Sequence, residues 1–293
     1  MRDPTTQPIL HHYDASPWAE VARLALGLKG LEWGSVIIPT VCPKPELATL
    51  TGGYVRTPVL QIGADVFCDT LAILEALEVR WPEPSLYPPP LGAGHRALAL
   101  KAGGPVFLAA VGVALADLPD EGFEEFWADR ERRFGLRREA FRAMVPSLRS
   151  AFAQHLEWLE RELADGRPFL GGDAPGHGDL AHFMLVWFAA RGGPFDAVAP
   201  ALTPWARRVA EVGHGHPTPL TAEAALAAAR AATPSFTTGG RPVAVRQEGS
   251  QDPPVEGRLA AEDATGFWIV RHHPQTGCVA VRFPWEGQIL EDA

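Results

Sequence analysis

The sequence predicts a multidomain protein that combines an α/β domain, an all-α domain and a small β-rich C-terminal extension. Three observations predict this class. Extended and helical patterns alternate over residues 1–85, helical periodicity runs almost unbroken over residues 90–233, and a period-two alternation follows over residues 234–293. A chain of 293 residues is long enough for about two domains with cores of their own.

The first domain is expected to open with a short strand over residues 8–13. Ser16-Pro17 then marks a helix start, because a serine side chain caps free amides and proline suits the first turn. One face of this helix carries an apolar stripe with helical spacing, formed by Val21, Leu24, Ala25 and Leu28. The sequence therefore predicts a strand and a helix that packs through this stripe.

Three strands and a second helix are expected to complete the first domain. They are predicted at residues 34–38, 58–62, 66–68 and from Asp69-Thr70 onward, with a loop over residues 39–56. The predicted order is strand, helix, strand, strand, strand, helix.

A proline-rich linker from Pro82 to Gly94 separates the first domain from the second. Two apolar stripes with helical spacing follow, one made of Phe152, Leu156, Leu159 and Leu163, the other of Leu180, Phe183, Met184, Trp187 and Phe188. Helices are expected to continue to about Ala232. These features predict an all-helical domain over residues 90–233.

The C-terminal extension changes character again. Val279, Val281 and Phe283 alternate with other residues at the period of a strand, and Val243/Val245 and Phe267/Ile269 follow the same rule. We expect a small β-barrel-like or curled sheet over residues 234–293 that is separable from the rest of the chain. Three roles stay open for it: packing on the helical domain, extending a dimer interface, or binding a protein partner.

Composition narrows the function classes. The net charge of −9 argues against nucleic-acid binding, which needs a basic face. The three cysteines are widely spaced and odd in number, so a reducing, cytoplasmic compartment is expected. Residues 1–8 are polar and resemble no signal peptide, and no run of eighteen apolar residues predicts a membrane span.

Three motifs carry a family resemblance. They are Ser16-Pro17-Trp18 with Val21-Ala22-Arg23, Thr57-Pro58-Val59-Leu60 with Asp69-Thr70, and Phe169-Leu170-Gly171-Gly172-Asp173 with Asp179. Their order and spacing resemble those of the glutathione S-transferases over roughly residues 8–232. Within that family, Ser16 matches the serine of the theta and zeta classes or the cysteine of the omega class, so the chain looks like a serine-type or omega-like, bacterial-style member.

The resemblance implies a thioredoxin-like N-terminal domain that binds glutathione and an all-helical second domain. It further implies glutathione as co-substrate, a small electrophile held between the domains, and a homodimer. A cytoplasmic location with no membrane and no nucleic-acid partner fits the same family. The C-terminal extension lies outside the common two-domain pattern.

Ser16 is the candidate catalytic residue. Glutathione reacts as a thiolate, and the partial positive charge of a helix N-terminus favours an anion there. A hydroxyl at this point can donate a hydrogen bond to the sulfur and lower the pKa of the thiol further. The alternative interpretation is a plain helix cap. The resemblance aligns His12 with the tyrosine that other classes use, which disfavours a tyrosine mechanism.

Thr57, Pro58, Asp69 and Thr70 are the candidate substrate-binding residues. The resemblance implies a cis Thr57-Pro58 bond that leaves the Thr57 backbone free for the cysteinyl part of glutathione. At the start of a helix, free amides and the Thr70 hydroxyl suit the γ-glutamyl carboxylate, and Asp69 can pair with its ammonium group. The alternative is a helix cap that holds no ligand.

Other chemical groups are expected to be structural. The histidine pairs lack cysteine or carboxylate neighbours at metal spacing, so no metal site is predicted. Cys68 is expected to be buried and inert, and the arginine run over residues 130–138 to form a solvated helix face. Gly176 departs from the family, which usually has serine or threonine there as a helix cap, but Asp179 can still bind the preceding amides.

Two function classes remain open. The first is a glutathione transferase, and the second is a non-catalytic member of the same fold that serves as an interaction module. Thiol-disulfide exchange is disfavoured, because residue 16 is serine and not cysteine.

Overall fold

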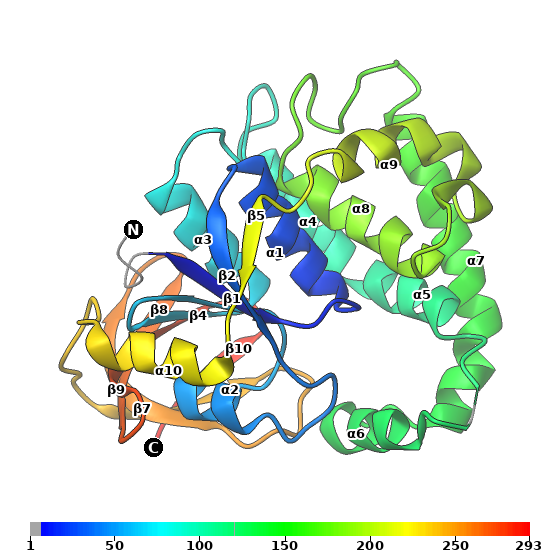
Figure 1. The fold of residues 1–293 in the computed structure, drawn as a ribbon. Coiled ribbons are helices and arrows are strands. Elements are labelled where there is room, and N and C mark those ends of the chain that lie inside the picture. The colour runs from blue at the N-terminus through cyan, green and yellow to red at the C-terminus, as the bar shows by residue number, and fades with distance from the viewer. Residues whose placement is uncertain (1–6, 120) are drawn as a thin grey trace.

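The computed structural model of this protein describes residues 7–119 and 121–293, and it confirms the predicted fold class. The first domain follows the predicted order of elements, with one helix added (Figure 1). Its elements are β1 (Pro8–His12), α1 (Pro17–Leu28), β2 (Glu32–Ile37), α2 (Pro45–Thr51), β3 (Val59–Ile62), β4 (Asp65–Cys68) and α3 (Thr70–Arg80). Residues 1–6, where no signal peptide is expected, lie outside the described part of the chain.

The added helix is α2, in a stretch for which the sequence predicts a loop. Pro45 begins this helix and Gly52 ends it in the left-handed conformation, with φ of 89°. Leu47 and Leu50 are buried in the core beneath the sheet. A helix of this length is held by packing more than by local propensity, so the sequence of the segment gives little sign of it.

The sheet of the first domain has two buried faces. β1 is parallel to β2 and antiparallel to β3, and β4 forms a hairpin with β3. Successive side chains of a strand point to opposite faces. Leu10 accordingly lies in the core that contains α1 and α3, whereas its neighbour Ile9 lies in the core that contains α2.

The second domain is helical as predicted as far as residue 210. Its helices are α4 (Gly94–Gly103), α5 (Pro105–Ala114), α6 (Glu124–Phe134), α7 (Arg138–Glu162), α8 (His177–Ala190) and α9 (Thr203–Ala210). Phe152 and Leu159 are buried on α7, and Leu180, Phe183 and Met184 are buried on α8, as the two stripes predict. α8 packs against α1 and α4 and thereby joins the two domains.

No single helix of the described residues is long and apolar enough to cross a membrane, and α4 and α5 reach that length and hydropathy only when taken together, as a pair bent by 51°.

The start of α8 explains the departure at Gly176. Asp179 accepts hydrogen bonds from the backbone amides of Leu170 at 2.8 Å and Gly176 at 3.2 Å, as expected. A Cβ atom at residue 176 would lie 2.4 Å from the ring of His95, which is fully buried. The imidazole therefore fills the space that a serine or threonine would need, and the Asp179 carboxylate supplies the cap.

Residues 213–232 return to the first domain, although the sequence predicts that they belong to the helical one. β5 (His216–Pro219) pairs in parallel with β2, and α10 (Ala222–Ala231) lies beside α2 (Figure 1). Gln61 donates an amide hydrogen to the Ala225 carbonyl at 2.8 Å. The segment pairs with the edge of β2 and covers the second face of the sheet, so its return buries apolar surface and satisfies backbone groups.

The extension continues the sheet of the first domain. Its strands are β6 (Pro242–Gln247), β7 (Val255–Glu262), β8 (Gly266–His273), β9 (Gly277–Pro284) and β10 (Gln288–Asp292). β9 pairs in parallel with β4, so the strand order is β10-β6-β7-β8-β9-β4-β3-β1-β2-β5. Val281 and Phe283 share one core with Val66 and Cys68. The domain limits stay predictions, but the shared sheet and core argue against a separable unit.

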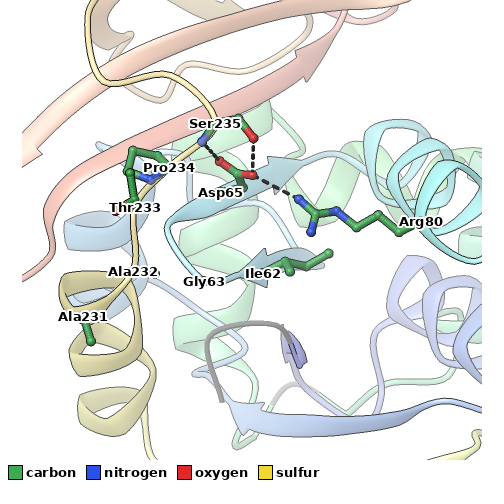
Figure 2. Close-up of a pocket in the computed structure, with 9 residues that line it drawn as sticks. All are labelled: Ile62, Gly63, Asp65, Arg80, Ala231, Ala232, Thr233, Pro234 and Ser235. Atoms are coloured by element: carbon green, nitrogen blue, oxygen red, sulfur yellow. Dashed lines mark hydrogen bonds and ion pairs between the residues drawn. The ribbon is translucent and has the colours of Figure 1, made fainter. Parts of the chain in front are cut away.

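Asp65 fastens the start of the extension to the first domain. Its carboxylate accepts hydrogen bonds from the backbone amide and the hydroxyl of Ser235 at 2.7 and 2.6 Å, and from Arg80 at 3.1 Å (Figure 2). One carboxylate thus joins β4, the end of α3 and the segment after α10.

Candidate functional site

Three predicted segments meet at one end of the sheet. β1 and β3 are antiparallel with His11 opposite Val59, so the residues after β1 lie beside those before β3. In the β3–β4 hairpin Val59 lies opposite Cys68, so the residues after β4 reach the same end. This end therefore holds the five predicted site residues, Ser16, Thr57, Pro58, Asp69 and Thr70.

Ser16 forms the N-cap of α1, as its sequence context predicts. Its hydroxyl oxygen accepts a hydrogen bond from the backbone amide of Ala19 at 3.3 Å, and the side chain is buried. A serine hydroxyl also carries one hydrogen to donate, and this bond does not use it. The geometry is therefore compatible with capping and with donation to a ligand sulfur.

Thr57 and Pro58 are joined by a cis peptide bond, as the resemblance implies. The Thr57 hydroxyl accepts a hydrogen bond from Lys44 at 3.0 Å, and Lys44 also donates to the Val55 carbonyl at 3.1 Å. The Lys44 ammonium lies 5.5 Å from the ring centre of Tyr13, in the turn before Ser16. Lys44 thus ties two segments of the site together.

Lys44 is itself an unusual cation. The side chain is buried, and burial together with nearby Arg133 lowers the pKa of Lys44 to about 8. At neutral pH the group is still mostly charged, so the site contains a poorly hydrated positive charge. Such a charge favours a negatively charged ligand nearby.

Asp69 adopts a strained backbone conformation at the start of α3. Its φ of 81° and ψ of 145° lie in a region that glycine favours, and such a residue costs about 1–3 kcal/mol. Its carboxylate accepts a hydrogen bond from the Leu71 amide at 3.0 Å, while burial raises the pKa of Asp69 above its ordinary value. The next residue, Thr70, is buried. Strain of this kind is concentrated at ligand-binding and catalytic positions.

The prediction of a solvated arginine face is wrong for α6. Arg133 is 3% exposed and forms a two-pronged ion pair with Asp252 of the extension, with N–O distances of 2.7 and 2.9 Å. Asp129, also buried, accepts a hydrogen bond from the Cys42 amide at 3.2 Å. Arg132, with 59% of its side chain exposed, and Arg137 beyond the end of α6, with 74%, have the expected exposure.

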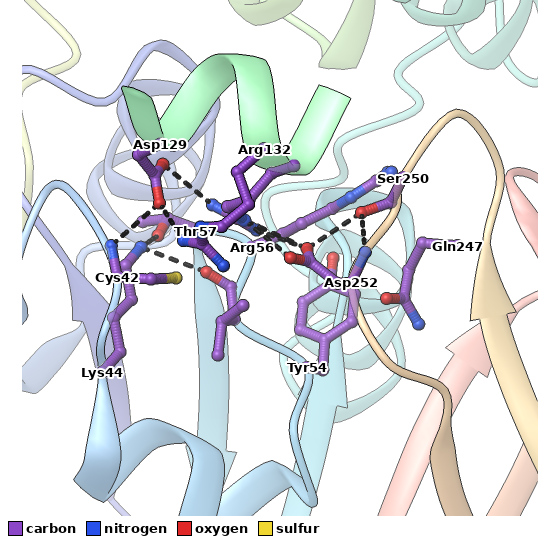
Figure 3. A network of polar contacts seen from close by, with 12 residues as sticks. Cys42, Lys44, Tyr54, Arg56, Thr57, Asp129, Arg132, Gln247, Ser250 and Asp252 are labelled. Carbon is purple, nitrogen blue, oxygen red and sulfur yellow. Dashed lines mark hydrogen bonds and ion pairs between the residues drawn. The ribbon is translucent and has the colours of Figure 1, made fainter. Parts of the chain in front are cut away.

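These contacts hold α6 next to the segment of chain that precedes Thr57. Figure 3 shows α6 above this stretch, with Asp252 and Ser250 of the extension beside it. Arg56 donates to the Glu248 carbonyl at 2.7 Å, and its guanidinium lies 5.7 Å from the ring centre of Phe134, the last residue of α6. The helical domain and the extension therefore both contribute to this end of the sheet.

Sequence reasoning missed most of the polar groups around the site, namely Lys44, Arg56, Asp129, Arg133 and Asp252. Lys44 precedes a short helix that the sequence does not predict, and each of the other four forms a hydrogen bond with a residue far away in the chain. The proximity of Arg56 to the Thr57-Pro58 motif is the one local signal that could have pointed to them.

His12, which the resemblance aligns with a tyrosine, belongs to a structural network. It contacts the Ser35 hydroxyl at 2.9 Å and the Arg23 guanidinium at 3.1 Å. Burial and the Arg23 charge lower the pKa of His12 to about 4, so the ring is neutral at pH 7. Arg23 pairs in turn with buried Glu20, whose carboxylate contacts His214 at 3.0 Å.

Two surface cavities lie elsewhere. One of about 430 Å³ lies beside Asp65 and Ser235, and one of about 320 Å³ lies beside Trp205 and Arg208. Neither is lined by a predicted site residue, and the polar groups of the first, on Asp65, Arg80 and Ser235, are hydrogen-bonded to one another. We therefore place the candidate site by strand register and side-chain chemistry.

The fold and this site define a class of protein with a thioredoxin-like first domain and a helical second domain. The family model described as glutathione S-transferase, N-terminal domain, matches residues 10–85. A solved structure of a GST-like protein from Pseudomonas syringae is 33% identical to this chain, covers 98% of this chain and 99% of its own, and has a TM-score of 0.79. The chain belongs to the glutathione S-transferase family.

Two further structures share the fold at lower identity. A glutathione S-transferase from Rhodospirillum rubrum is 22% identical, covers 70% of this chain and 88% of its own, and has a TM-score of 0.56. The rice protein GST1, solved in complex with glutathione, is 26% identical, covers 71% and 88%, and has a TM-score of 0.50. The match to the Pseudomonas syringae protein is more extensive and includes most of the C-terminal extension, since it leaves only 2% of this chain uncovered.

Proposed function

We propose that this protein is a glutathione transferase of the serine type, in which Ser16 activates the glutathione thiol for attack on a small electrophile. The observation that carries the proposal is the strained Asp69 at the start of α3, at the same end of the sheet as Ser16 and Thr57. The rice relative was solved with glutathione, which supports glutathione as the ligand of this fold.

Each part of the tripeptide has a candidate partner. The γ-glutamyl carboxylate meets the free amides and the Thr70 hydroxyl at the start of α3, and Asp69 pairs with the ammonium group. The Thr57 backbone holds the cysteinyl part, and the sulfur lies at the N-terminus of α1 beside Ser16. Positive charge from Lys44 completes a site that suits an anionic peptide.

The chemistry requires a thiolate. The Ser16 hydroxyl donates a hydrogen bond to the glutathione sulfur, which lowers the pKa of the thiol and leaves the proton to solvent. The sulfur then attacks the electrophilic carbon, a carbon–sulfur bond forms, and the leaving group departs with its electron pair. The helical-domain side chains that face this end of the sheet would hold the electrophile.

The proposal includes a homodimer in the cytoplasm, as the family resemblance implies. Cys42, Cys68 and Cys278 are free thiols, which supports a reducing compartment. Sedimentation equilibrium of the purified protein tests the dimer. The alternative, a non-catalytic interaction module, predicts that an activated aryl chloride is not conjugated even when glutathione binds.

The site assignment is tested by the double variant Asp69→Asn, Thr70→Val. It removes an ionic partner and a hydroxyl, each worth about 1.5–3 kcal/mol when charge assists the bond, so glutathione should bind at least ~10-fold more weakly. Isothermal titration calorimetry measures the affinity. Asp173→Asn is the matched control, because Asp173 is an exposed carboxylate on the second-domain loop. Equal affinity of the double variant and wild type would overturn the assignment.

A further inference from the structure

The C-terminal extension contains a turn that lies beside the candidate site. β9 and β4 are parallel, with Val66 opposite Val281 and Phe67 opposite Arg282. Parallel strands end at the same edge of a sheet, so the residues after β9 lie beside the residues after β4. The residues after β4 are Asp69 and Thr70, and those after β9 are the turn over residues 285–287.

Hydrogen bonds confirm where this turn lies. The carbonyl of Gly287 accepts from the Glu248 amide at 3.0 Å, and the carbonyl of Glu248 accepts from Arg56 at 2.7 Å. Arg56 directly precedes Thr57. The turn is thus connected to both flanks of the site, to Thr57 through Arg56 and to Asp69 through the parallel strands.

Glu286 is the charged residue of this turn. Its carboxylate forms an ion pair with Arg96 of α4 at 2.5 Å, and 41% of its side chain is exposed. Burial is the main reason that the pKa of Asp69 is raised, and the negative charge of Glu286 raises it further, while Arg56 and Arg96 oppose the effect. The parallel register thus brings two carboxylates, those of Asp69 and Glu286, to the same end of the sheet.

We infer that Glu286 is a specificity-determining residue of the glutathione site, contributed by the C-terminal extension, and that it selects ligands with a free α-ammonium group. The inference rests on the proposed function. A γ-glutamyl ammonium placed against Asp69 gains a second carboxylate in Glu286, and Arg96 holds that carboxylate in place. A ligand without the ammonium group would bring no positive charge to offset the negative charges of the two carboxylates.

Arg56 adds a complementary feature. Its Nε hydrogen is buried and, within the described part of the chain, has no hydrogen-bond partner. Buried donors of this kind are rare unless a ligand or water satisfies them. An anionic oxygen of the ligand would satisfy it, so the neighbourhood of Asp69 offers carboxylates to an ammonium and a donor to a carboxylate. That combination suits the zwitterionic end of an amino acid.

The test compares two ligands that differ only in the ammonium group. Reduced glutathione and glutaryl-cysteinylglycine share both carboxylates and the thiol, but the second lacks the amine. Isothermal titration calorimetry at pH 7 gives the affinity of wild type and Glu286→Gln for each. Because Glu286 is partly exposed, we expect the Glu286→Gln variant to bind glutathione about fivefold more weakly than wild type does. Its affinity for the analogue should equal that of wild type.

Glu291→Gln is the matched control. Glu291 also lies in the extension and pairs with an arginine, Arg246, at 3.0 Å on the exposed strand β10. It should leave both affinities unchanged. Thermal unfolding of each variant checks that the fold persists, and Glu286→Asp, which keeps the charge on a shorter side chain, should retain part of the preference for the ammonium.

The outcomes separate this inference from the proposed function. If Glu286→Gln keeps the full preference for glutathione, or loses the same factor with both ligands, the selective role of Glu286 is wrong while glutathione binding stands. If wild type binds neither ligand, the proposed function fails and the role of Glu286 fails with it.

Discussion

Ser16 can cap α1 and activate a thiol at the same time. The cap bond uses a lone pair of the hydroxyl oxygen, which accepts from Ala19 at 3.3 Å. The hydroxyl hydrogen can then point to a sulfur at the end of the helix, where the helix dipole already favours negative charge. The two interpretations of Ser16 therefore differ in their kinetic consequences and not in their geometry.

The Ser16→Ala substitution separates these interpretations. If Ser16 stabilises the thiolate, the change should raise the pKa of bound glutathione and slow conjugation at neutral pH by roughly 10- to 1,000-fold, the scale of losing one preorganised donor. Affinity should change little, because Thr57, Asp69 and Thr70 hold the rest of the tripeptide. The measurement is a pH titration of the ultraviolet absorbance of the bound thiolate.

Thr221→Ala is the control for the cap. Thr221 caps α10 in the same way, with its hydroxyl accepting from the Ala224 amide at 3.1 Å. Both substitutions should cost about 1 kcal/mol of stability, but only Ser16→Ala should move the titration curve. Superimposable curves for wild type and Ser16→Ala would mean that Ser16 only caps the helix.

At the scale of elements, the Arg133–Asp252 pair fixes α6 to the extension. Burial alone would raise the pKa of Asp252, but the bonds from Arg133 lower it below its ordinary value. An acid whose pKa is lowered on folding contributes stability at pH values above its unfolded pKa, and this contribution is lost as the pH falls through the folded value. The pair is therefore intact at neutral pH.

The Asp252→Asn substitution should destabilise the protein and loosen α6. Removing one charge of a buried pair costs about 3–5 kcal/mol, because the other charge stays buried with less compensation. Urea denaturation measures the loss, and hydrogen exchange should show faster exchange of the α6 amides. Asp117→Asn, which breaks an exposed pair with Arg149, should cost less than about 1 kcal/mol. Equal effects of the two substitutions would contradict the anchoring role.

The order of elements could be predicted, and the five candidate site residues could be placed at the ends of strands and starts of helices, because these signals are local. A capping serine before a proline, an apolar stripe and a period-two alternation each act within a few residues of sequence. The position of α6 could not be predicted in this way. Arg132 and Arg133 are adjacent residues of the same type, and nothing in the sequence distinguishes them. Arg132 is nevertheless exposed, whereas Arg133 is buried against Asp252, 119 residues away.

The packing of α10 and the extension on the first domain could not be predicted either, for a related reason. The apolar positions of these segments predict a buried face, and the structure confirms that they are buried. Which surface covers them depends on the free edges of β2 and β4, and a single sequence contains no pairing signal between such distant strands. The sequence therefore predicts strands in the extension but not their neighbours.

At the scale of the whole molecule, truncation after Thr233 should destabilise the first domain. The extension shares a core with Ile9, Val59 and Val66, and its removal would expose this apolar surface and the edge of β4. We expect the truncated chain to be largely insoluble and to bind no glutathione. The soluble fraction and circular dichroism measure the effect, with truncation after Leu290 as a mild control. A soluble, folded chain of 233 residues would show that the extension is separable.

The last prediction concerns acid, because several histidines are buried in their neutral form. Burial lowers the pKa to about 4 in His11, His12 and His155, and to about 3 in His177. The unfolded chain, with ordinary histidines of pKa about 6.5, binds these protons first. The contribution of these histidines to the free energy of unfolding is therefore fully present above pH 6.5. It is lost as the pH falls toward 4, by about 1.4 kcal/mol for each histidine and pH unit.

Urea denaturation between pH 7 and pH 5 should show this loss directly. Calorimetric unfolding at pH 5.5 in buffers of different ionisation enthalpy should show several protons taken up per molecule. His155→Gln removes one such group and should lower the proton uptake by about one, since His155 is neutral when folded and mostly charged when unfolded at this pH. The matched control is His272→Gln, at an exposed position. Proton uptake that His155→Gln does not reduce would mean that this histidine is charged in the folded protein.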